Sequence, residues 1–361
     1  MKRTSSILPA CAVVAFAMGG CGESPPPQAV APVTTSSAPV ASPSPAPSAA
    51  SSAAPAASSV PAQEPKKTEA MLRLEADRAR WEEGNRNELA RWTPALHAEA
   101  KALVDKAYPD TQSALRAILA SKHRRPGSSD RDKARHPIET LEFFGFKQTM
   151  TTVEIAPGEG WFTEILAPAL AAKGHLVVTT PDPNGSADER STFYGQRLIA
   201  FLDHSPELYG RAQALVVDDK EPSLGAEGSA DLVLSMRTLH GNVANGTLDA
   251  WLAAVHRVLK SKGVFGVEEH RARPDAVAQE SAKKGYLPEK WVIGQIESAG
   301  FKLAGKSEIN ANPKDTKDYP DGVWTLPPTL RLGDQDRARY TAIGESDRMT
   351  LKFVRVDQPG K

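Results

Sequence analysis

From residue 151 to the end of the chain, stretches with the patterns of strands and helices alternate. This alternation predicts an α/β fold built on a doubly wound, mostly parallel sheet with helices on both faces. The last two strands have no predicted helix between them, so we expect them to pair like a hairpin around an insertion, 311–346. Strands are expected at 151–157, 175–180, 212–219, 229–236, 263–270, 302–310 and 348–356, and helices at 162–174, 189–206, 246–263 and 289–301.

The residues that precede the alternating part have helical patterns rich in Glu, Arg, Lys and Ala. We therefore expect a helical N-terminal extension, 66–130, followed by the sheet domain, 131–361. The expected helices cover 66–107, with breaks at Gly84 and Pro94, then 111–121, capped by Thr111, and 137–144.

The first 21 residues have the pattern of an export signal. Lys2 and Arg3 precede an apolar run, 7–18, which is shorter than the ~20 residues that a membrane-spanning helix needs. Residues 22–65 form the next segment, in which 33 of 44 residues are Pro, Ala or Ser. Such a composition buries too little apolar area to offset the entropy of ordering, so it predicts a disordered linker.

The sequence Met18-Gly-Gly-Cys21 at the end of the signal resembles the cleavage site of bacterial lipoproteins. The resemblance implies that Cys21 is lipidated and becomes the mature N-terminus, with Gly22 favouring the periplasmic side of the outer membrane. A lipid anchor contributes about 0.8 kcal/mol per buried methylene. A plain signal cut nearby and a short N-terminal anchor are the alternatives.

Charge and cysteine content exclude several classes of protein. Lys and Arg number 44, as do Asp and Glu, so the net charge is zero and a dedicated nucleic-acid partner is not expected. Of the two cysteines, Cys11 lies in the signal and Cys21 is the proposed lipid site. The mature domain would then have no disulfide, no thiol nucleophile and no thiolate metal ligand.

The first predicted strand carries an acid, Glu154, and leads into a glycine-rich turn with Gly158 and Gly160. In doubly wound folds, ligands bind beyond the carboxyl ends of the strands, at the turn into the first helix. Glycines there let the backbone take left-handed angles and approach a ligand closely. The turn is therefore the first candidate for a binding site.

The spacing of Glu154, Ala156, Gly158 and Gly160 resembles the acid-x-Gly-x-Gly-x-Gly loop of class I (Rossmann-like) S-adenosylmethionine (SAM) methyltransferases, with Ala156 in place of the first Gly. The resemblance covers roughly 130–310 plus the antiparallel last strand, and several segments are similar to a poorly characterised bacterial group of predicted methyltransferases. It implies SAM as cofactor, with Glu154 near the amino group of SAM and the glycine turn against its amino-acid portion.

Two further acids follow from the same resemblance. The second strand of the family usually ends in an acid that binds the ribose, and Thr180 stands there. Asp182 comes two residues later, so it is either the ribose ligand or a residue of a Pro-Asp-Pro-Asn-Gly turn. Asp218, at the end of the third strand, matches the acid that contacts the adenine amino group.

Acceptor-side candidates follow the fourth and fifth strands. His240 is a possible base, needed only if the methyl acceptor carries a proton to lose; a surface or helix-capping His is the alternative. Arg237 could attract an anionic acceptor. Glu268 and His270 would share one face of a strand, but two ligands do not make a metal site, and we expect no metal. Tyr319 and Trp324 make the insertion either a substrate-binding lid or an ordered surface loop.

The leading functional hypothesis is SAM-dependent methyl transfer to a small-molecule acceptor by a protein tethered in the cell envelope. An exported domain lies outside the compartment where SAM is made, and fold alone does not determine function. The alternatives are a non-catalytic envelope protein that binds another small molecule, and a structural protein that reuses the fold. Ala156 and Thr180 favour these alternatives, whereas Glu154, Gly158 and Gly160 favour methyl transfer.

Overall fold

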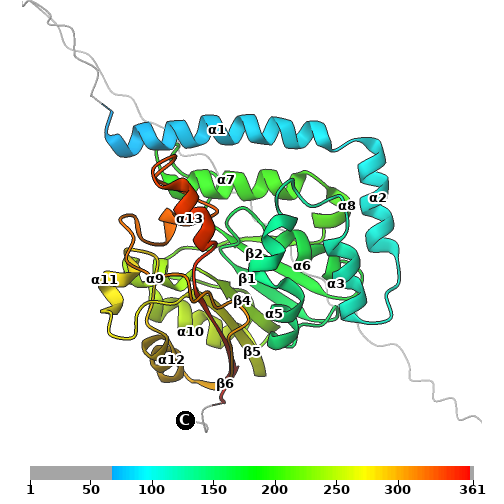
Figure 1. Ribbon diagram of the computed structural model, residues 1–361. Coiled ribbons are helices and arrows are strands. Elements are labelled where there is room, and N and C mark those ends of the chain that lie inside the picture. The colour runs from blue at the N-terminus through cyan, green and yellow to red at the C-terminus, as the bar shows by residue number, and fades with distance from the viewer. Residues whose placement is uncertain (1–66, 358–361) are drawn as a thin grey trace, which may run out of the picture. The chain divides into compact units, whose positions relative to one another are not determined.

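A computed structural model describes residues 67–357; the predicted signal, Cys21 and the linker lie outside them. The core is a seven-stranded sheet in the order β3-β2-β1-β4-β5-β7-β6 (Figure 1). Neighbouring strands are parallel except at β7, which is antiparallel to both β5 and β6. The predicted fold class is thus confirmed. The strands are β1 Thr151–Ile155, β2 His175–Thr180, β3 Gln213–Val216, β4 Ala230–Met236, β5 Leu259–His270, β6 Phe301–Ser307 and β7 Arg348–Arg355.

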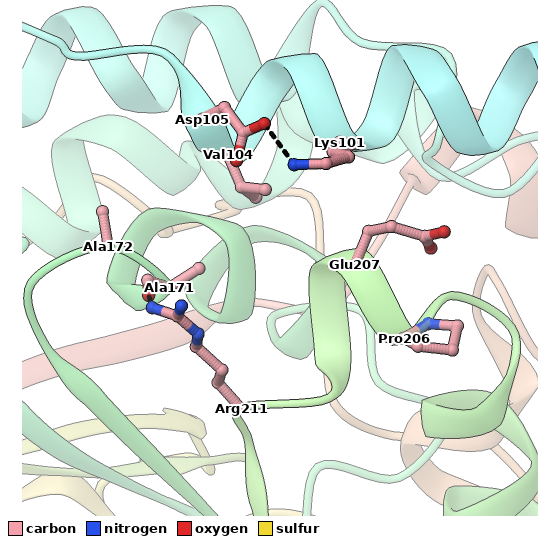
Figure 2. A pocket seen from close by; sticks show the side chains of 8 residues that line it. All are labelled: Lys101, Val104, Asp105, Ala171, Ala172, Pro206, Glu207 and Arg211. Carbon is pink, nitrogen blue, oxygen red and sulfur yellow. Dashed lines mark hydrogen bonds and ion pairs between the residues drawn. The ribbon is translucent and has the colours of Figure 1, made fainter.

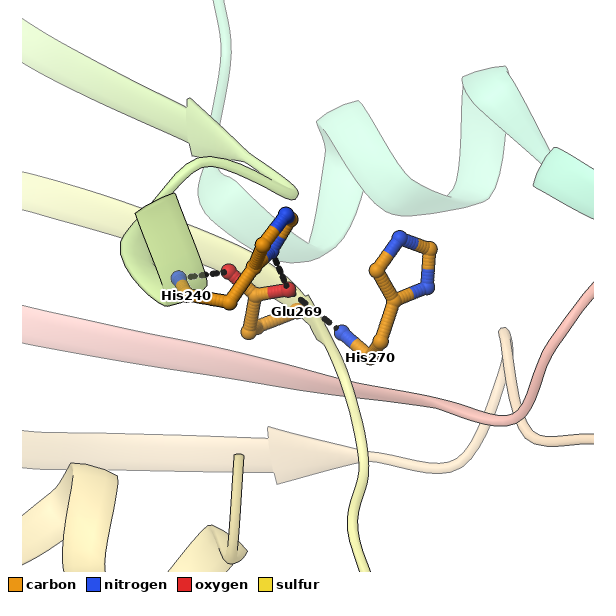
Figure 3. A group of neighbouring side chains, drawn as sticks. All are labelled: His240, Glu269 and His270. Atoms are coloured by element: carbon orange, nitrogen blue, oxygen red, sulfur yellow. Dashed lines mark hydrogen bonds and ion pairs between the residues drawn. The ribbon is translucent and has the colours of Figure 1, made fainter. Parts of the chain in front are cut away.

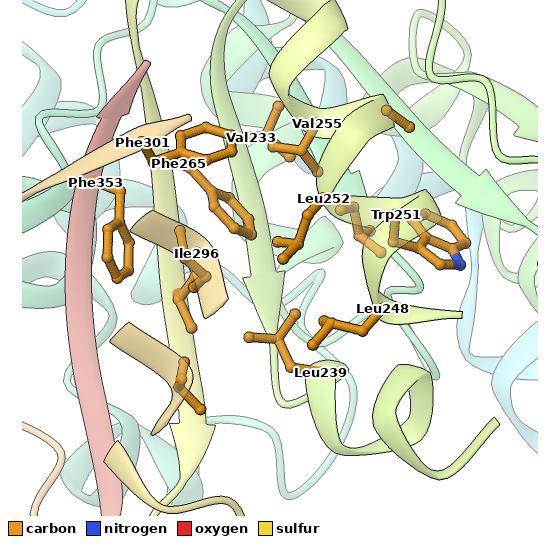
Figure 4. Packing of buried hydrophobic residues seen from close by; sticks show 14 of the residues in the cluster. Val233, Leu239, Leu248, Trp251, Leu252, Val255, Phe265, Ile296, Phe301 and Phe353 are labelled. Atoms are coloured by element: carbon orange, nitrogen blue, oxygen red, sulfur yellow. The ribbon is translucent and has the colours of Figure 1, made fainter. Parts of the chain in front are cut away.

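Helices cover both faces of this sheet, because side chains that alternate along each strand enter two separate cores. Val153 and Val233 point to one face, where they pack with α10 (Leu248–Val258) and α12 (Glu289–Ser298), as Figure 4 shows for the labelled residues. Leu232 and Leu234 point to the other face, where they pack with α5, α6 and α7. These helices span Pro137–Phe144, Thr163–Leu170 and Arg190–Asp203.

The N-terminal helices share the second of these cores. Trp92, Leu96 and Ile118 are buried together with residues of α6 and β4. Helix α1 lies along α7 (Figure 1), where the Trp81 and Phe193 rings meet edge to face at 5.7 Å. The helices are α1 Glu69–Arg91, α2 Pro94–Asp105, α3 Thr111–Leu119, the 3₁₀ turn η1 Ser129–Arg131 and α4 Asp132–Arg135.

Some predicted boundaries of these helices are wrong. Gly84 does not break α1, because it faces open space and one Gly within a helix destabilises it by only about 1 kcal/mol relative to Ala. The break falls before Pro94, as predicted. Thr111 is not the cap of α3: Asp110 is, and its carboxylate accepts a hydrogen bond from the Ser113 backbone N–H at 2.7 Å.

The region between the sixth and seventh strands is also more structured than predicted. The insertion contains η2, Gly322–Thr325, and α13, Arg337–Ile343, so a helix does lie between the last two strands. The helix predicted at 189–206 corresponds to α7, and a separate helix, α8 (Pro206–Tyr209), begins where the predicted one ends. The helix predicted at 246–263 gives way to β5 at Leu259. Several short helices were not predicted, among them α4, α8, α9 Leu239–Asn245 and α11 Ala278–Ala282. Within residues 67–357, no helix combines the length and apolar character needed to cross a membrane.

Candidate functional site

The carboxylate of Glu154 is buried at the second face of the sheet. Its side chain is about 1% exposed, and Oε2 accepts a hydrogen bond from the Thr163 hydroxyl at 2.8 Å. Burial raises the pKa of Glu154 to about 7, against the lowering effects of Thr163 and Arg237. A carboxyl group with this pKa changes charge readily when a cationic group approaches it.

The turn after β1 has the backbone angles that the glycine pattern requires. Ala156, Gly158 and Gly160 have φ values of +44°, +62° and +78°. The Ala156 N–H donates to Thr179 Oγ1 at 2.9 Å, which ties the turn to β2. A Cβ at Gly158 would meet no atom within 4 Å, so the turn is open on that side.

Gly160 serves a different purpose from Gly158. A Cβ there would lie 2.6 Å from Cε1 of Phe201, so the absence of a side chain lets the turn pack directly on the α7 ring. Glu159, between them, pairs with Arg197 of α7. The open face of the turn is therefore at Gly158, and the closed face is at Gly160.

Asp182 and Asp218 follow the ends of β2 and β3, at the same edge of the sheet as the turn. Both are exposed and both organise local turns: Asp182 accepts from Asn184 N–H, and Asp218 accepts from the N–H groups of Lys220 and Glu221. These backbone hydrogen bonds lower the pKa of Asp218. Thr180, the last residue of β2, is buried.

Asp219 is a residue of this edge that received no role in the sequence analysis. Its Oδ1 accepts a hydrogen bond from Trp251 Nε1 at 2.7 Å. Asp219 therefore fixes the end of β3 against α10, while its neighbour Asp218 faces solvent. The sequence offers two adjacent acids without a signal that assigns these different directions.

His240, Glu269 and His270 form a compact group at the ends of β4 and β5 (Figure 3), with one ligand-type atom from each within 4.8 Å of the others. His240 Nδ1 lies 3.0 Å from Glu269 Oε1. Glu269 also accepts from the His240 N–H at 3.1 Å and from the His270 N–H at 2.8 Å. His270 reaches Glu269 only through its backbone N–H, whereas its ring lies 5.6 Å from that of His240 and its Nδ1 lies 2.6 Å from Ser346 Oγ.

Glu268 points to the opposite face of β5 from Glu269, among arginines. It is fully buried, and its Oε1 lies 2.9 Å from Arg237 Nη1 and 3.1 Å from Arg348 Nε. Arg237 itself has a φ of +63°, a left-handed angle unusual for a residue with a side chain. Glu268 is thereby committed to balancing buried guanidinium groups, and its contact restrains Arg237.

The insertion contributes one of its two predicted substrate residues to this group. The Trp324 ring lies 6.0 Å from that of His240, at 69°. Tyr319 is buried in the insertion's own core against Tyr340, and its hydroxyl accepts from the Thr316 N–H. Trp324 is therefore placed beside the candidate site, and Tyr319 holds the insertion together.

A separate cavity of about 500 Å³ lies between α2, α8 and the end of α6 (Figure 2). Its lining includes Lys101, Asp105 and Arg211. Because α6 runs from the end of β1 back towards the start of β2, Ala171 and Ala172 place this cavity at the opposite edge of the sheet from the glycine turn. It is not part of the group described above.

Comparisons with known proteins give similarity in three-dimensional structure alone. No family model and no curated protein matches the chain. Solved structures that resemble it include a SAM-dependent methyltransferase from Aquifex aeolicus, 14% identical, with a TM-score of 0.41, covering 68% of this chain and 98% of that one. The [4+2]-cyclase SpnF is 13% identical, with a TM-score of 0.45 and coverages of 70% and 98%. The 1,6-didemethyltoxoflavin-N1-methyltransferase of Burkholderia thailandensis, solved with S-adenosylhomocysteine, is 13% identical, with a TM-score of 0.39 and coverages of 64% and 82%.

Proposed function

We propose that this chain is a SAM-dependent methyltransferase that acts on a small-molecule acceptor. The observation that carries the proposal is the turn after β1, in which a buried acid precedes three residues with positive φ. The turn lies between β1 and β4, where the order of the strands in the sheet reverses: β2 and β3 follow on one side, and β5 follows on the other. In doubly wound sheets, ligands bind at this reversal point. The open space at Gly158 fits a ligand that approaches the backbone.

In this proposal, Glu154 and the turn at Gly158 hold the amino-acid part of SAM, and Asp182 and Asp218 hold the ribose and the adenine. Bound SAM supplies a methyl group already activated by a sulfonium, so the protein mainly positions the acceptor. Arg237, His240, His270 and Trp324 surround the acceptor. Glu268 and Tyr319 support these residues from behind.

Isothermal titration calorimetry of the purified full chain with SAM and with S-adenosylhomocysteine tests the proposal. We expect micromolar binding of both, weakened at least tenfold by Glu154→Gln, which keeps the size of the side chain and removes its charge. Glu227→Gln, at an exposed acid far along the chain, is the matched control. A folded wild-type protein that binds neither compound would refute the proposal.

A non-catalytic binding protein is the second candidate, and two observations favour it. Ala156 carries a side chain at φ +44°, where the related pattern has Gly. Thr180 stands where the related pattern has the ribose-binding acid, and its hydroxyl is buried and donates to the Pro181 carbonyl. Absence of SAM binding, combined with retention of another small molecule on purification, would support this candidate.

We further propose that the protein is held in the cell envelope by a lipid on Cys21, with residues 22–65 as the spacer. The support is the order of charged start, short apolar run, Gly-Gly-Cys and Pro/Ala/Ser-rich segment. Metabolic labelling with a radioactive fatty acid in a bacterial host tests it. Labelling that persists in Cys21→Ser would exclude this site.

A further inference from the structure

Glu269 is a buried carboxylate that binds two backbone N–H groups and one imidazole nitrogen. It is fully buried at the end of β5. Oε2 accepts from the His240 backbone N–H, and Oε1 accepts from the His270 backbone N–H. Backbone N–H groups only donate, so both oxygens act as acceptors, and His240 Nδ1, 3.0 Å from Oε1, is the remaining donor.

This contact determines which nitrogen of His240 is free. In a neutral imidazole one nitrogen carries the proton and the other carries a lone pair, and the partner of the first sets the choice. With Nδ1–H donated to Glu269, the lone pair is on Nε2. Among residues 67–357, no hydrogen bond engages Nε2, and the His240 side chain is 15% exposed.

His240 also lies close to the turn that we propose binds SAM. In the sheet register, Ile155 at the end of β1 is level with Ser235 of β4. His240 follows in the first turn of α9, five residues after Ser235. It therefore emerges from the strand next to β1, at the same edge, and Trp324 of the insertion covers one side of its ring.

The imidazole of His270, which lies beside that of His240, is held in its neutral form by burial and by the cations around it. The two rings are 5.6 Å apart. Burial, followed by repulsion from His240 and Arg237, places the pKa of His270 well below its ordinary value. The charged and titratable groups around the pair are Arg135, Arg237, Arg348, Glu268 and Glu269.

We infer that His240 is the general base of the reaction through Nε2, that Glu269 is its positioning residue, and that the acceptor is a hydroxyl or amine that carries a proton to lose. The inference rests on the proposed function. The proton passes from the acceptor to Nε2, the freed lone pair forms the bond to the methyl carbon, and the electron pair of the broken carbon–sulfur bond stays on sulfur. A carboxylate acceptor would have no use for this dyad.

The tautomer of His240 tests the inference without any acceptor. The full chain is labelled with ¹⁵N-histidine, and nitrogen–proton correlation spectra are recorded near pH 7.5; His240→Gln and His240→Asn identify the His240 signals. We expect His240 to be protonated at Nδ1, which is the minor form of free histidine. In Glu269→Gln, the fraction of His240 that is protonated at Nδ1 should fall, while the affinity for S-adenosylhomocysteine stays within about twofold of wild type. Glu227→Gln should change neither the tautomer nor the affinity.

The outcomes separate the inference from the proposed function. A wild-type His240 protonated at Nε2 would overturn the inference even if SAM binds. Stoichiometric shifts of both His240 and His270 signals on addition of Zn²⁺ or Mn²⁺ would also overturn it, because they would make the group a metal site. Expected tautomer signals in a protein that binds neither SAM nor its product would refute the proposed function and leave the Glu269–His240 contact standing. Once an acceptor is known, His240→Gln should lower kcat by about 10²–10⁴-fold. Glu269→Gln should lower it by about tenfold or more.

Discussion

Replacing Glu345 by Gln should destabilise the protein far more than replacing an exposed acid. Glu345 follows α13 and binds three guanidinium groups: Arg131 at 2.7 Å, Arg135 at 3.1 Å and Arg348 at 2.7 Å. The side chains of Arg135 and Arg348 are only 6% and 2% exposed. Gln keeps the shape and one acceptor oxygen, but it removes the negative charge that offsets these cations.

The expected loss follows from this burial. Removing one partner of a buried ion pair costs about 3–5 kcal/mol, because the other charge remains buried without compensation. The retained acceptor places the estimate at the lower end, about 3 kcal/mol, or about a hundredfold in the folding equilibrium. Glu308→Gln is the control: it removes an ion pair with Arg271 in which Glu308 is 62% exposed, and such pairs contribute about 1 kcal/mol or less.

Urea unfolding followed by tryptophan fluorescence measures both variants, and its pH dependence checks the cause. Burial alone would raise the pKa of Glu345, but Arg135, Arg348 and Arg131 outweigh it and hold this pKa well below its ordinary value. Such a group stabilises the folded state fully above its unfolded pKa of about 4.3, and this contribution falls away as the pH drops towards the folded value. The gap between wild type and Glu345→Gln should therefore be complete at pH 7 and shrink below about pH 4. A loss no larger than that of the control, or a gap independent of pH, would refute the reasoning.

Three other predictions concern the turn, the strand-one acid and the anchor. In the same urea assay, Gly160→Ala should lower the free energy of unfolding by about 1–3 kcal/mol, because the new Cβ would lie 2.6 Å from Phe201 at a residue with a positive φ. Gly158→Ala should lower it by only about 1 kcal/mol, because that residue has open space and only its positive φ is strained. Burial raises the pKa of Glu154 to about 7, above the value of about 4.3 in the unfolded chain. Protonated Glu154 therefore stabilises the folded state at low pH, and this contribution is lost as the pH rises from about 4.3 through 7. Between pH 5 and pH 8, the stability of Glu154→Gln should thus fall less than that of wild type. Cys21→Ser should release the protein from washed membranes into the soluble fraction, as judged by immunoblotting, and continued membrane retention would count against the lipid anchor.

The elements of the sheet could be predicted because their patterns are local. β2 was expected at 175–180 and lies at His175–Thr180, since a run of β-branched residues follows Gly174. The helix after Pro137 was likewise expected to end before Gly145, which has a φ of +80°. The short helices α9 and α11 were missed, because five to seven residues carry too little periodicity to stand out from a loop.

The candidate site was only partly predictable, because its geometry depends on contacts between distant segments. Alternation along β5 was the right rule, and it separates Glu268 from Glu269 on opposite faces. What the sequence could not supply was the direction of α9, which brings His240 to Glu269, 29 residues away. Trp324 reaches the same place from the insertion, and no local pattern connects it with His240.

The end of the insertion links these parts of the protein through three consecutive residues. Glu345 binds the arginines of the N-terminal segment and of β7, Ser346 Oγ lies 2.6 Å from His270 Nδ1, and Asp347 pairs with Lys317 at 2.9 Å. The three contacts reach the helices before β1, the imidazole pair and the insertion itself. Because Glu345 and Ser346 are adjacent in the chain, we expect a change that frees Glu345 to loosen the Ser346 contact with His270 as well. The three arginines on Glu345 should therefore affect the candidate site through the position of the insertion as well as through their charge, so that the stability of the insertion and the geometry of His270 change together.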